Sequence, residues 1–257
     1  DIFPDAVKIG MVSSAEIINT IADRLKYYNT KNIVLDTVMV STSVCKLLRD
    51  DAIDALTSVL FPIADIITPN LHEAQILCGF DIRSESDMVR AADVIYNKYN
   101  VTVLLKGGHL ANTSNDLLYD GNETWFEAVR IDNPNTHGTG CTLSSAIAAN
   151  LAKGMDIKTA VKSAKDYITG ALSDMLDLGK GSGPLNHMYK FLFHLICFYF
   201  LSILQMVHSM HFHHHINSFH KYLHYDNLFH LFLSMLKPFL LILNHQYFLL
   251  FYIYNSL

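Results

Sequence analysis

Apolar positions along the chain follow two spacings, which together predict a protein of alternating strands and helices. Short apolar runs are typical of buried parallel strands, and they cover 7–10, 33–35, 64–68 and 101–105. Longer stretches repeat apolar residues every three or four positions and predict amphipathic helices; they cover 14–28, 44–60, 73–78, 84–99, 139–153 and 156–176. Ser13 followed by Glu16 is a capping-box signal, which marks the start of the first helix.

Strands that alternate with helices are typical of parallel βαβ units with helices on both faces of one sheet. We therefore expect an α/β fold with a mostly parallel central sheet. A β-hairpin is expected at 117–126, where Asp120-Gly121 favours a type I′ turn. Ligands of such sheets bind beyond the carboxyl ends of the strands. Polar or Gly-rich residues occupy those ends here: Lys8 to Gly10, Asp36, Thr68 to Asn70, and Lys106 to His109.

A Gly-rich turn, Gly138-Thr139-Gly140-Cys141, leads directly into the helix predicted at 139–153. Unpaired N–H groups and the positive end of the helix dipole coincide at such a start and can bind an anion. A transferring phosphoryl group is a suitable anion. The helix start would favour the thiolate of Cys141, which could accept a proton from an attacking hydroxyl. The alternative is a packing role, and no Lys follows the second glycine as it does in a P-loop.

Composition changes near residue 190 and divides the chain. Of the 19 Lys and Arg only Lys221 and Lys237 lie beyond it, and of the 24 acidic residues only Asp226 does. The first part is mildly acidic, which gives no support to nucleic-acid binding. The four cysteines form no C-x-x-C pair, and no secretory signal peptide is recognisable. These features favour a reducing, cytoplasmic compartment.

The tail, residues 191–257, is rich in Phe, Leu, Ile, Tyr, His and Asn. Such residues dominate when an AT-rich non-coding or shifted reading frame is translated, so we interpret the tail as a segment that did not evolve to fold with the domain. Its apolar runs are interrupted and lie near or below the length of a membrane span. A membrane hairpin is the alternative, and membrane contact is expected only if the tail is genuine. The histidines within 211–215 have no partner cysteines or acid cluster for a metal site.

Six segments, in order, resemble the hydroxymethylpyrimidine/phosphomethylpyrimidine kinases of thiamine biosynthesis, a family of the ribokinase-like superfamily. They are Asp5 to Met11, Val34 to Val40, Ile67 to Ala74, Leu105 to His109, Asn135 to Ser145, and Gly181 to His187. The most specific is Asn-Thr-His-Gly-Thr-Gly-Cys, because sugar kinases and most pyridoxal kinases of the superfamily carry Asp at the position of Cys141. The resemblance implies a ribokinase-like domain over 1–190 whose opening strands are missing, followed by an unrelated tail that is irregular or helical.

The resemblance also implies an activity: ATP-dependent, Mg²⁺-assisted phosphorylation of hydroxymethylpyrimidine and of its monophosphate. Cys141 would be the catalytic base, beside an anion hole formed by the amides of Gly138, Thr139 and Gly140. Nucleotide contacts would come from Lys106, Gly108, His109, Asp36, Thr68 and Asn70. Mg²⁺ would be held by Asp36 and, mostly through water, by Glu73. Simpler interpretations are a helix-start acid for Glu73, a strand-end cap for Asp36 and a solvated lysine for Lys106. We expect a small-molecule pyrimidine substrate and a homo-oligomer.

Three departures from the family pattern qualify this interpretation. Thr37 occupies a position where the family usually has Pro, which removes a rigid φ but no chemical group. The family's region before Asp5, with a Gly/Ser-rich turn that holds the pyrimidine, is missing, so the pocket would lack one wall. The chain also continues past the family's usual end. Two alternatives therefore stay open: a pyridoxal or pyridoxamine kinase, and a non-catalytic truncated homologue that its tail tethers to a membrane.

Overall fold

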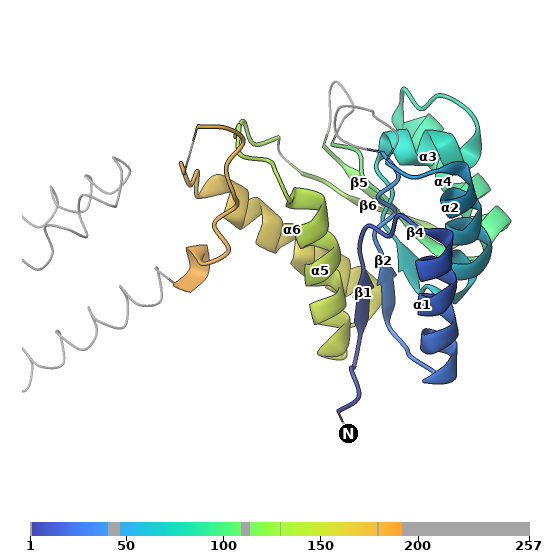
Figure 1. The fold of residues 1–257 in the computed structure, drawn as a ribbon. Coiled ribbons are helices and arrows are strands. Elements are labelled where there is room, and N and C mark those ends of the chain that lie inside the picture. Colours follow the sequence, from blue (N-terminus) through green and yellow to red (C-terminus); the bar gives the residue numbers. More distant parts are fainter. Residues whose placement is uncertain (1, 41–46, 109–113, 129, 179, 192–257) are drawn as a thin grey trace, which may run out of the picture. The chain divides into compact units, whose positions relative to one another are not determined.

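The computed structural model of this chain describes residues 2–40, 47–108, 114–128, 130–178 and 180–191. Six strands form one sheet in which spatial order follows sequence order (Figure 1). They are β1 (Val7–Ile9), β2 (Ile33–Leu35), β3 (Ile66–Ile67), β4 (Thr102–Leu105), β5 (Asp116–Tyr119) and β6 (Glu123–Phe126). Strands β1 to β4 pair in parallel, whereas β5 pairs antiparallel with both of its neighbours, β4 and β6. The predicted mostly parallel α/β sheet is confirmed.

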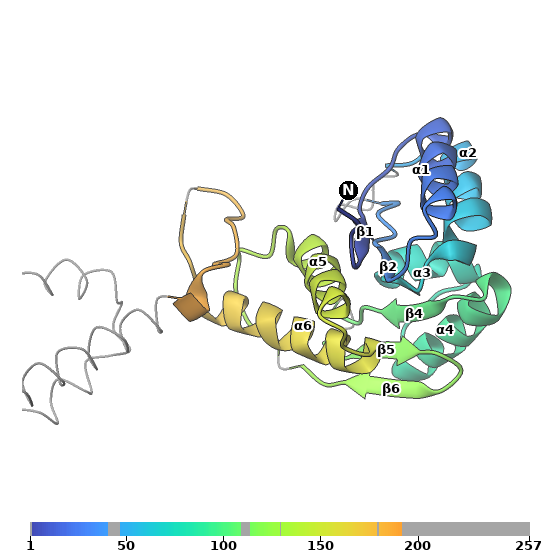
Figure 2. The ribbon, with the colours of Figure 1, turned by 90° about the horizontal axis from the view of Figure 1, so that it is seen from below.

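The described residues also form six α-helices, which cover both faces of the sheet. They are α1 (Ala15–Tyr27), α2 (Asp50–Ala55), α3 (Leu71–Cys78), α4 (Glu85–Tyr99), α5 (Thr139–Ala152) and α6 (Ile157–Ser173). A π-helical turn (Leu56–Leu60) and a 3₁₀ turn (Phe61–Ile63) continue α2. Helices α1 to α4 pack on one face, and α5 and α6 pack on the other (Figure 2).

Successive residues of the central strands point into two separate cores. In β4, Val103 and Leu105 join the core under α1 to α4, whereas Leu104 joins the core under α5 and α6. Side chains alternate between the faces of a strand, and both faces are covered, which explains why these strands are apolar throughout. Side chains continue to alternate between the two faces past the strand ends, so every second residue there faces α5.

Two predicted helix starts differ from the structure, and contacts of the backbone explain both. The prediction of a cap at Ser13 is wrong: Ser14 is the N-cap of α1, and its hydroxyl accepts the Ile17 N–H at 3.3 Å. The helix predicted from residue 44 begins at Asp50 within the described residues. The N–H groups at positions 47 and 48 donate to the carbonyl oxygen of Met39 at 2.9 and 3.4 Å, so they belong to a loop contact rather than to the helix.

The predicted β-hairpin is confirmed, but the type I′ turn is wrong. Three residues, 120–122, separate the paired residues Tyr119 and Glu123. A type I′ turn has two central residues, both at positive φ, whereas in this turn only Gly121 has a positive φ, of 96°. The hairpin therefore closes through a three-residue loop that uses the conformational freedom of one glycine.

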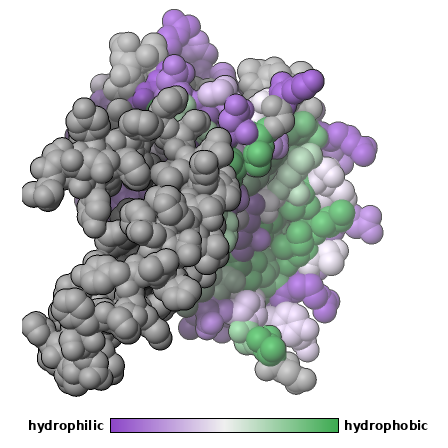
Figure 3. All heavy atoms as spheres, turned by 90° about the vertical axis from the view of Figure 1, so that its left-hand side faces the viewer, coloured by the Kyte–Doolittle hydropathy of each residue, from purple (hydrophilic) through white to green (hydrophobic). Residues whose placement is uncertain are grey.

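Strand β1 is the first strand of the described sheet, and several apolar side chains before and after it in the sequence are exposed. They are Ile2, Phe3, Met11, Ile17, Tyr27 and Tyr28. Figure 3 shows hydrophobic surface gathered in a band beside polar surface on one side of the molecule. Among the described residues, no helix combines the length and the apolar character that a membrane crossing requires. The tail after residue 191 lies outside the described residues, so its irregular or helical structure stays a prediction.

Candidate active site

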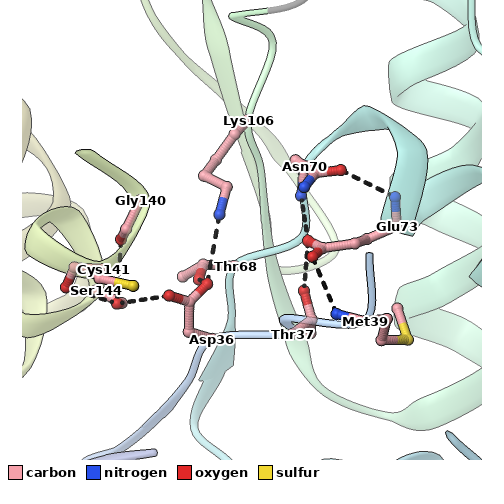
Figure 4. Close-up of polar contacts among 10 residues, drawn as sticks. All are labelled: Asp36, Thr37, Met39, Thr68, Asn70, Glu73, Lys106, Gly140, Cys141 and Ser144. Atoms are coloured by element: carbon pink, nitrogen blue, oxygen red, sulfur yellow. Dashed lines mark hydrogen bonds and ion pairs between the residues drawn. The ribbon is translucent and has the colours of Figure 1, made fainter. Parts of the chain in front are cut away.

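Three strand ends supply a row of polar side chains on the face of the sheet that α5 covers. Asp36 follows β2, Thr68 follows β3 and Lys106 follows β4. The Thr68 hydroxyl donates to Asp36 Oδ1 at 3.2 Å, and the Lys106 ammonium lies 3.4 Å from the same oxygen (Figure 4). Asp36 is only 3% exposed, so these donors offset the cost of burying its charge.

The backbone around Lys106 is fixed on both sides. The Lys106 N–H donates to the Pro69 carbonyl oxygen at 2.9 Å, and the Gly107 N–H donates to Asp116 Oδ1 at 2.9 Å. A Cβ on Gly107 would lie 1.9 Å from the carbonyl oxygen of Asn115, which no side chain can occupy. Glycine at 107 therefore lets the end of β4 approach the start of β5, and this contact sets the direction of the Lys106 side chain.

A buried ion pair supports this strand end from the α6 side. Asp116, which receives the Gly107 N–H, also lies 2.7 Å from the Lys165 ammonium. Lys165 donates in addition to the carbonyl oxygen of Phe126 at 3.2 Å. Neither residue belongs to a recognisable motif, so this pair was not predicted from the sequence.

Helix α5 starts at the predicted Gly-rich turn. Gly138 is its N-cap and has a φ of 82°, a conformation that favours glycine. The Thr139 N–H donates to the carbonyl oxygen of Thr136 at 3.3 Å. The N–H groups of Gly140 and Cys141 lie in the first helical turn, where a helix provides no acceptor. These two N–H groups are therefore the best placed of the turn to receive an anion.

The start of α5 meets the polar row of the sheet. One turn into the helix, the Ser144 hydroxyl donates to Asp36 Oδ2 at 3.1 Å. A Cβ on Gly140 would lie 3.5 Å from Lys106 Nζ, so the ammonium is next to the Gly-rich turn. Cys141 is an exposed free thiol in this turn. The structure thus brings together a thiol, a cation, a carboxylate and a helix N-terminus, as Figure 4 shows.

A second polar cluster surrounds Glu73 at the start of α3. Asn70 is the N-cap, and the two residues form a capping box: the Glu73 N–H donates to Asn70 Oδ1 at 3.0 Å, and the Asn70 N–H donates to Glu73 Oε2 at 2.8 Å. The Thr37 hydroxyl and the Met39 N–H also donate to this carboxylate, at 3.0 and 3.2 Å. Burial raises the pKa of Glu73 above its ordinary 4.5, although Lys106 and these hydrogen bonds act in the opposite direction.

The carboxylate oxygens of Asp36 and Glu73 are the groups that could bind a Mg²⁺ ion. Mg²⁺ usually keeps several waters and binds one or two carboxylates together with substrate phosphates. Among the described residues each carboxylate accepts two donors on one oxygen and one donor on the other, the single donors being Ser144 on Asp36 Oδ2 and Met39 on Glu73 Oε1. No group of three or more metal-ligating side chains converges in the part of the chain that the structure describes. Asp36 lies beside Lys106 and the Gly-rich turn, so an ion held there would be completed by phosphate and water oxygens, whereas Glu73 belongs to the adjoining cluster.

A hydrogen-bonded clamp ties the chain before the Gly-rich turn to the segment after α6. Asn135 donates through Nδ2 to the Leu176 carbonyl oxygen at 2.7 Å, and its Oδ1 accepts the Gly183 N–H at 2.6 Å. Asn133 accepts the Asn135 N–H at 2.7 Å and donates to the Leu172 carbonyl oxygen at 2.7 Å. This clamp was not predicted from the sequence. The signal that could have located it is the Gly-Ser-Gly-Pro motif at 181–184.

Most of the residues predicted for the site lie where the strand-end rule places them. Asp36, Thr68, Lys106 and the turn 138–141 meet at one edge of the sheet, with Asn70 and Glu73 in the adjoining cluster. Gly108 is exposed, and a Cβ there would meet nothing within 4 Å. His109 lies outside the described residues.

The fold and this site define a small-molecule kinase of the ribokinase-like class. The chain belongs to the phosphomethylpyrimidine kinase family, whose model matches residues 1–186. The hydroxymethylpyrimidine/phosphomethylpyrimidine kinase of Streptomyces coelicolor is 45% identical over 188 residues, which cover 73% of this chain and 70% of that relative. The resemblance inferred from the six segments is therefore confirmed.

Two solved structures support the same assignment. An ADP complex of Bacillus subtilis pyridoxal kinase superposes with a TM-score of 0.68 at 39% identity, covering 73% of this chain and 72% of that one. The phosphomethylpyrimidine kinase from Clostridium difficile superposes with a TM-score of 0.59 at 44% identity, covering 66% of this chain and 69% of that one. These similarities confirm the predicted ribokinase-like fold.

Proposed function

We propose that this chain transfers the γ-phosphoryl group of ATP to the hydroxymethyl group of hydroxymethylpyrimidine, and then to the monophosphate that results. The observation that carries the proposal is that Cys141, the start of α5 and Lys106 meet at one sheet edge. Phosphoryl transfer needs positive potential around the moving group and a base for the attacking hydroxyl. The site offers both.

Cys141 and the Gly-rich turn would act on the reacting atoms. The exposed Cys141 sulfur would take the proton from the hydroxymethyl oxygen as that oxygen attacks the γ-phosphorus and the bond from the γ-phosphorus to ADP breaks. The amides of Gly140 and Cys141, together with that of Gly138, would stabilise the charge on the equatorial oxygens, helped by the dipole of α5. The Thr139 amide would contribute less, because it already donates to Thr136.

The polar row would receive the phosphates of ATP. Lys106 would bind phosphate oxygens, and the open strand end at Gly108 and His109 would border the nucleotide. Asp36, supported by Thr68, would hold Mg²⁺, and Glu73 would act through water while its capping partner Asn70 shapes the start of α3. Bound Mg²⁺ would neutralise part of the phosphate charge. The solved ADP complex of a related kinase supports the use of ATP.

Phosphorylation of pyridoxal is the second candidate function, and one observation favours it: the superposed Bacillus subtilis structure is a pyridoxal kinase. The family match and the Streptomyces coelicolor relative favour the pyrimidine instead. Cys141 supports the same choice, because most pyridoxal kinases of the superfamily carry Asp there.

The domain boundary, the cellular location and the oligomeric state of the enzyme are also proposed. We place the end of the kinase domain near residue 190, which the end of the family match at residue 186 supports, and we treat 191–257 as a separate segment. A cytoplasmic location suits a mechanism that needs a reduced thiol, and Cys78 and Cys141 are both free. Assembly into a homo-oligomer stays a prediction.

The test is a phosphorylation assay with the full chain, ATP and Mg²⁺. Hydroxymethylpyrimidine and pyridoxal are supplied separately, and products are identified by mass spectrometry. We expect the pyrimidine to become a monophosphate and then a diphosphate. Phosphorylation of pyridoxal alone would replace the proposal by its alternative. ATP binding without transfer to either compound would show a non-catalytic homologue.

A further inference from the structure

Lys8 places a second ammonium group at the edge of the sheet that carries the site. Lys8 pairs with Val34 across β1 and β2, and Val34 is buried in the core under α5 and α6. Cross-strand partners share a face of the sheet, so the half-buried Lys8 side chain lies on the α5 face. Its Nζ lies 2.9 Å from the position that a Cβ on Gly10 would take. The ammonium has therefore reached the carboxyl end of β1.

This ammonium and that of Lys106 lie on opposite sides of Asp36. The Asp36 N–H donates to the Ile9 carbonyl oxygen at 2.9 Å, so Gly10 and Asp36 are neighbours on strands about 5 Å apart. Lys106 approaches Asp36 from the β4 side, at 3.4 Å. Along this edge the order is Lys8, Asp36, Lys106. Among the residues that the structure describes, Lys8 forms no ion pair with a carboxylate.

The two transfers of the proposed function differ in the charge of their acceptor. The first acceptor is a neutral hydroxymethyl group, whereas the second is a phosphate monoester that carries about two negative charges near neutral pH. That phosphate must approach a γ-phosphoryl group of the same sign, and like charges repel strongly where water is excluded. The second transfer therefore needs a cation on the acceptor side that the first does not need.

The geometry separates the donor side from the acceptor side. Attacking and leaving oxygens lie roughly in line in phosphoryl transfer. Lys106 lies beside Gly140 and close to the strand end that would border the nucleotide, so the acceptor approaches from the opposite side, over β2 and β1. Lys8 is the ammonium on that side, and a lysine binds phosphate as a point charge.

We infer that Lys8 binds the phosphate group of the monophosphate acceptor and makes the second transfer possible. The inference rests on the proposed function and adds a specificity-determining residue to it. Gly10 contributes by having no side chain, which leaves the Lys8 ammonium its place at the sheet edge.

The test compares both acceptors with the full-length Lys8→Met variant at saturating ATP. We expect kcat/KM for the monophosphate to fall about 10- to 100-fold, the range of one charge-assisted hydrogen bond, and kcat/KM for hydroxymethylpyrimidine to change less than about threefold. Lys8→Arg should restore most of the loss, because it restores the charge. Lys31→Met is the matched control, since Lys31 is an exposed lysine just before β2, at the end of the strand away from the site. This variant should leave kcat/KM unchanged for both acceptors.

A binding titration with the monophosphate provides a second measurement that does not depend on turnover. Weaker binding to Lys8→Met, with unchanged thermal unfolding, supports the inference. Equal losses on both acceptors would assign Lys8 a structural role, and unchanged rates on both would remove it from the site; either result overturns the inference. If the wild-type chain phosphorylates neither acceptor, the proposed function itself fails, and the wild-type control reveals this separately.

Discussion

The Asn135 clamp makes a quantitative prediction for stability. Asn135→Ala removes the bond from Nδ2 to the Leu176 carbonyl oxygen, at 2.7 Å, and the bond from the Gly183 N–H to Oδ1, at 2.6 Å. Gly183 is buried, so its N–H loses its acceptor, which costs about 1–3 kcal/mol. Leu176 is half-buried, so water can replace the lost donor to its carbonyl oxygen, and that bond costs about 1 kcal/mol. The free energy of unfolding should fall by about 2–4 kcal/mol.

Urea denaturation of the full chain measures this difference, with the fluorescence of the single tryptophan, Trp125 on β6, as the signal. Asn97→Ala is the matched control, because Asn97 is exposed and its side-chain amide donates to Asp93 one turn away. It should change the free energy of unfolding by less than about 0.5 kcal/mol. If the two variants differ by less than about 1 kcal/mol, the clamp does not stabilise the protein as argued from its bonds.

Two further predictions concern residues beside the site. Burial raises the pKa of the Glu73 carboxyl above 4.5. The folded protein therefore keeps the proton on Glu73 at pH values where the unfolded chain has lost it. This stabilisation of the folded state is fully present below pH 4.5 and is lost as pH rises through the folded-state pKa. In urea titrations, the stability of the wild type relative to Glu73→Gln should therefore increase from about pH 7 down to 4.5, and a decrease would contradict the shift. Gly107→Ala places a Cβ 1.9 Å from a backbone oxygen, so we expect a raised KM for ATP together with lower thermal stability. Gly108→Ala, whose Cβ has open space, should keep the thermal stability of the wild type, and equal losses in the two variants would refute the steric argument.

Periodicity and the strand-end rule predicted the parts of the fold that depend on neighbouring residues. The continuous apolar run of β4 marks a strand that is buried on both faces, and the order of strands and helices predicts a mostly parallel sheet. Because the carboxyl ends of parallel strands share one edge, the sequence also predicted that Asp36, Thr68 and Lys106 would meet. The structure bears this out with contacts of 3.2 and 3.4 Å at the Asp36 carboxylate.

Features that depend on distant partners were not predictable in this way. The capping-box spacing favours Ser13 in the sequence, whereas the geometry around Ile17 selects Ser14. The ion pair of Asp116 and Lys165 joins residues that are 49 positions apart. No local pattern marks either partner, because the helix–sheet packing that buries them is a property of the whole fold.

The Cys141→Ala variant tests whether the turn ending in Cys141 is the site of phosphoryl transfer. The measurement is the turnover of hydroxymethylpyrimidine alongside the affinity for ATP in the absence of that substrate. We predict that kcat falls about 100- to 10,000-fold, the usual contribution of a general base, while ATP affinity stays unchanged because the nucleotide contacts come from the strand ends. Turnover equal to that of the wild type would contradict the account.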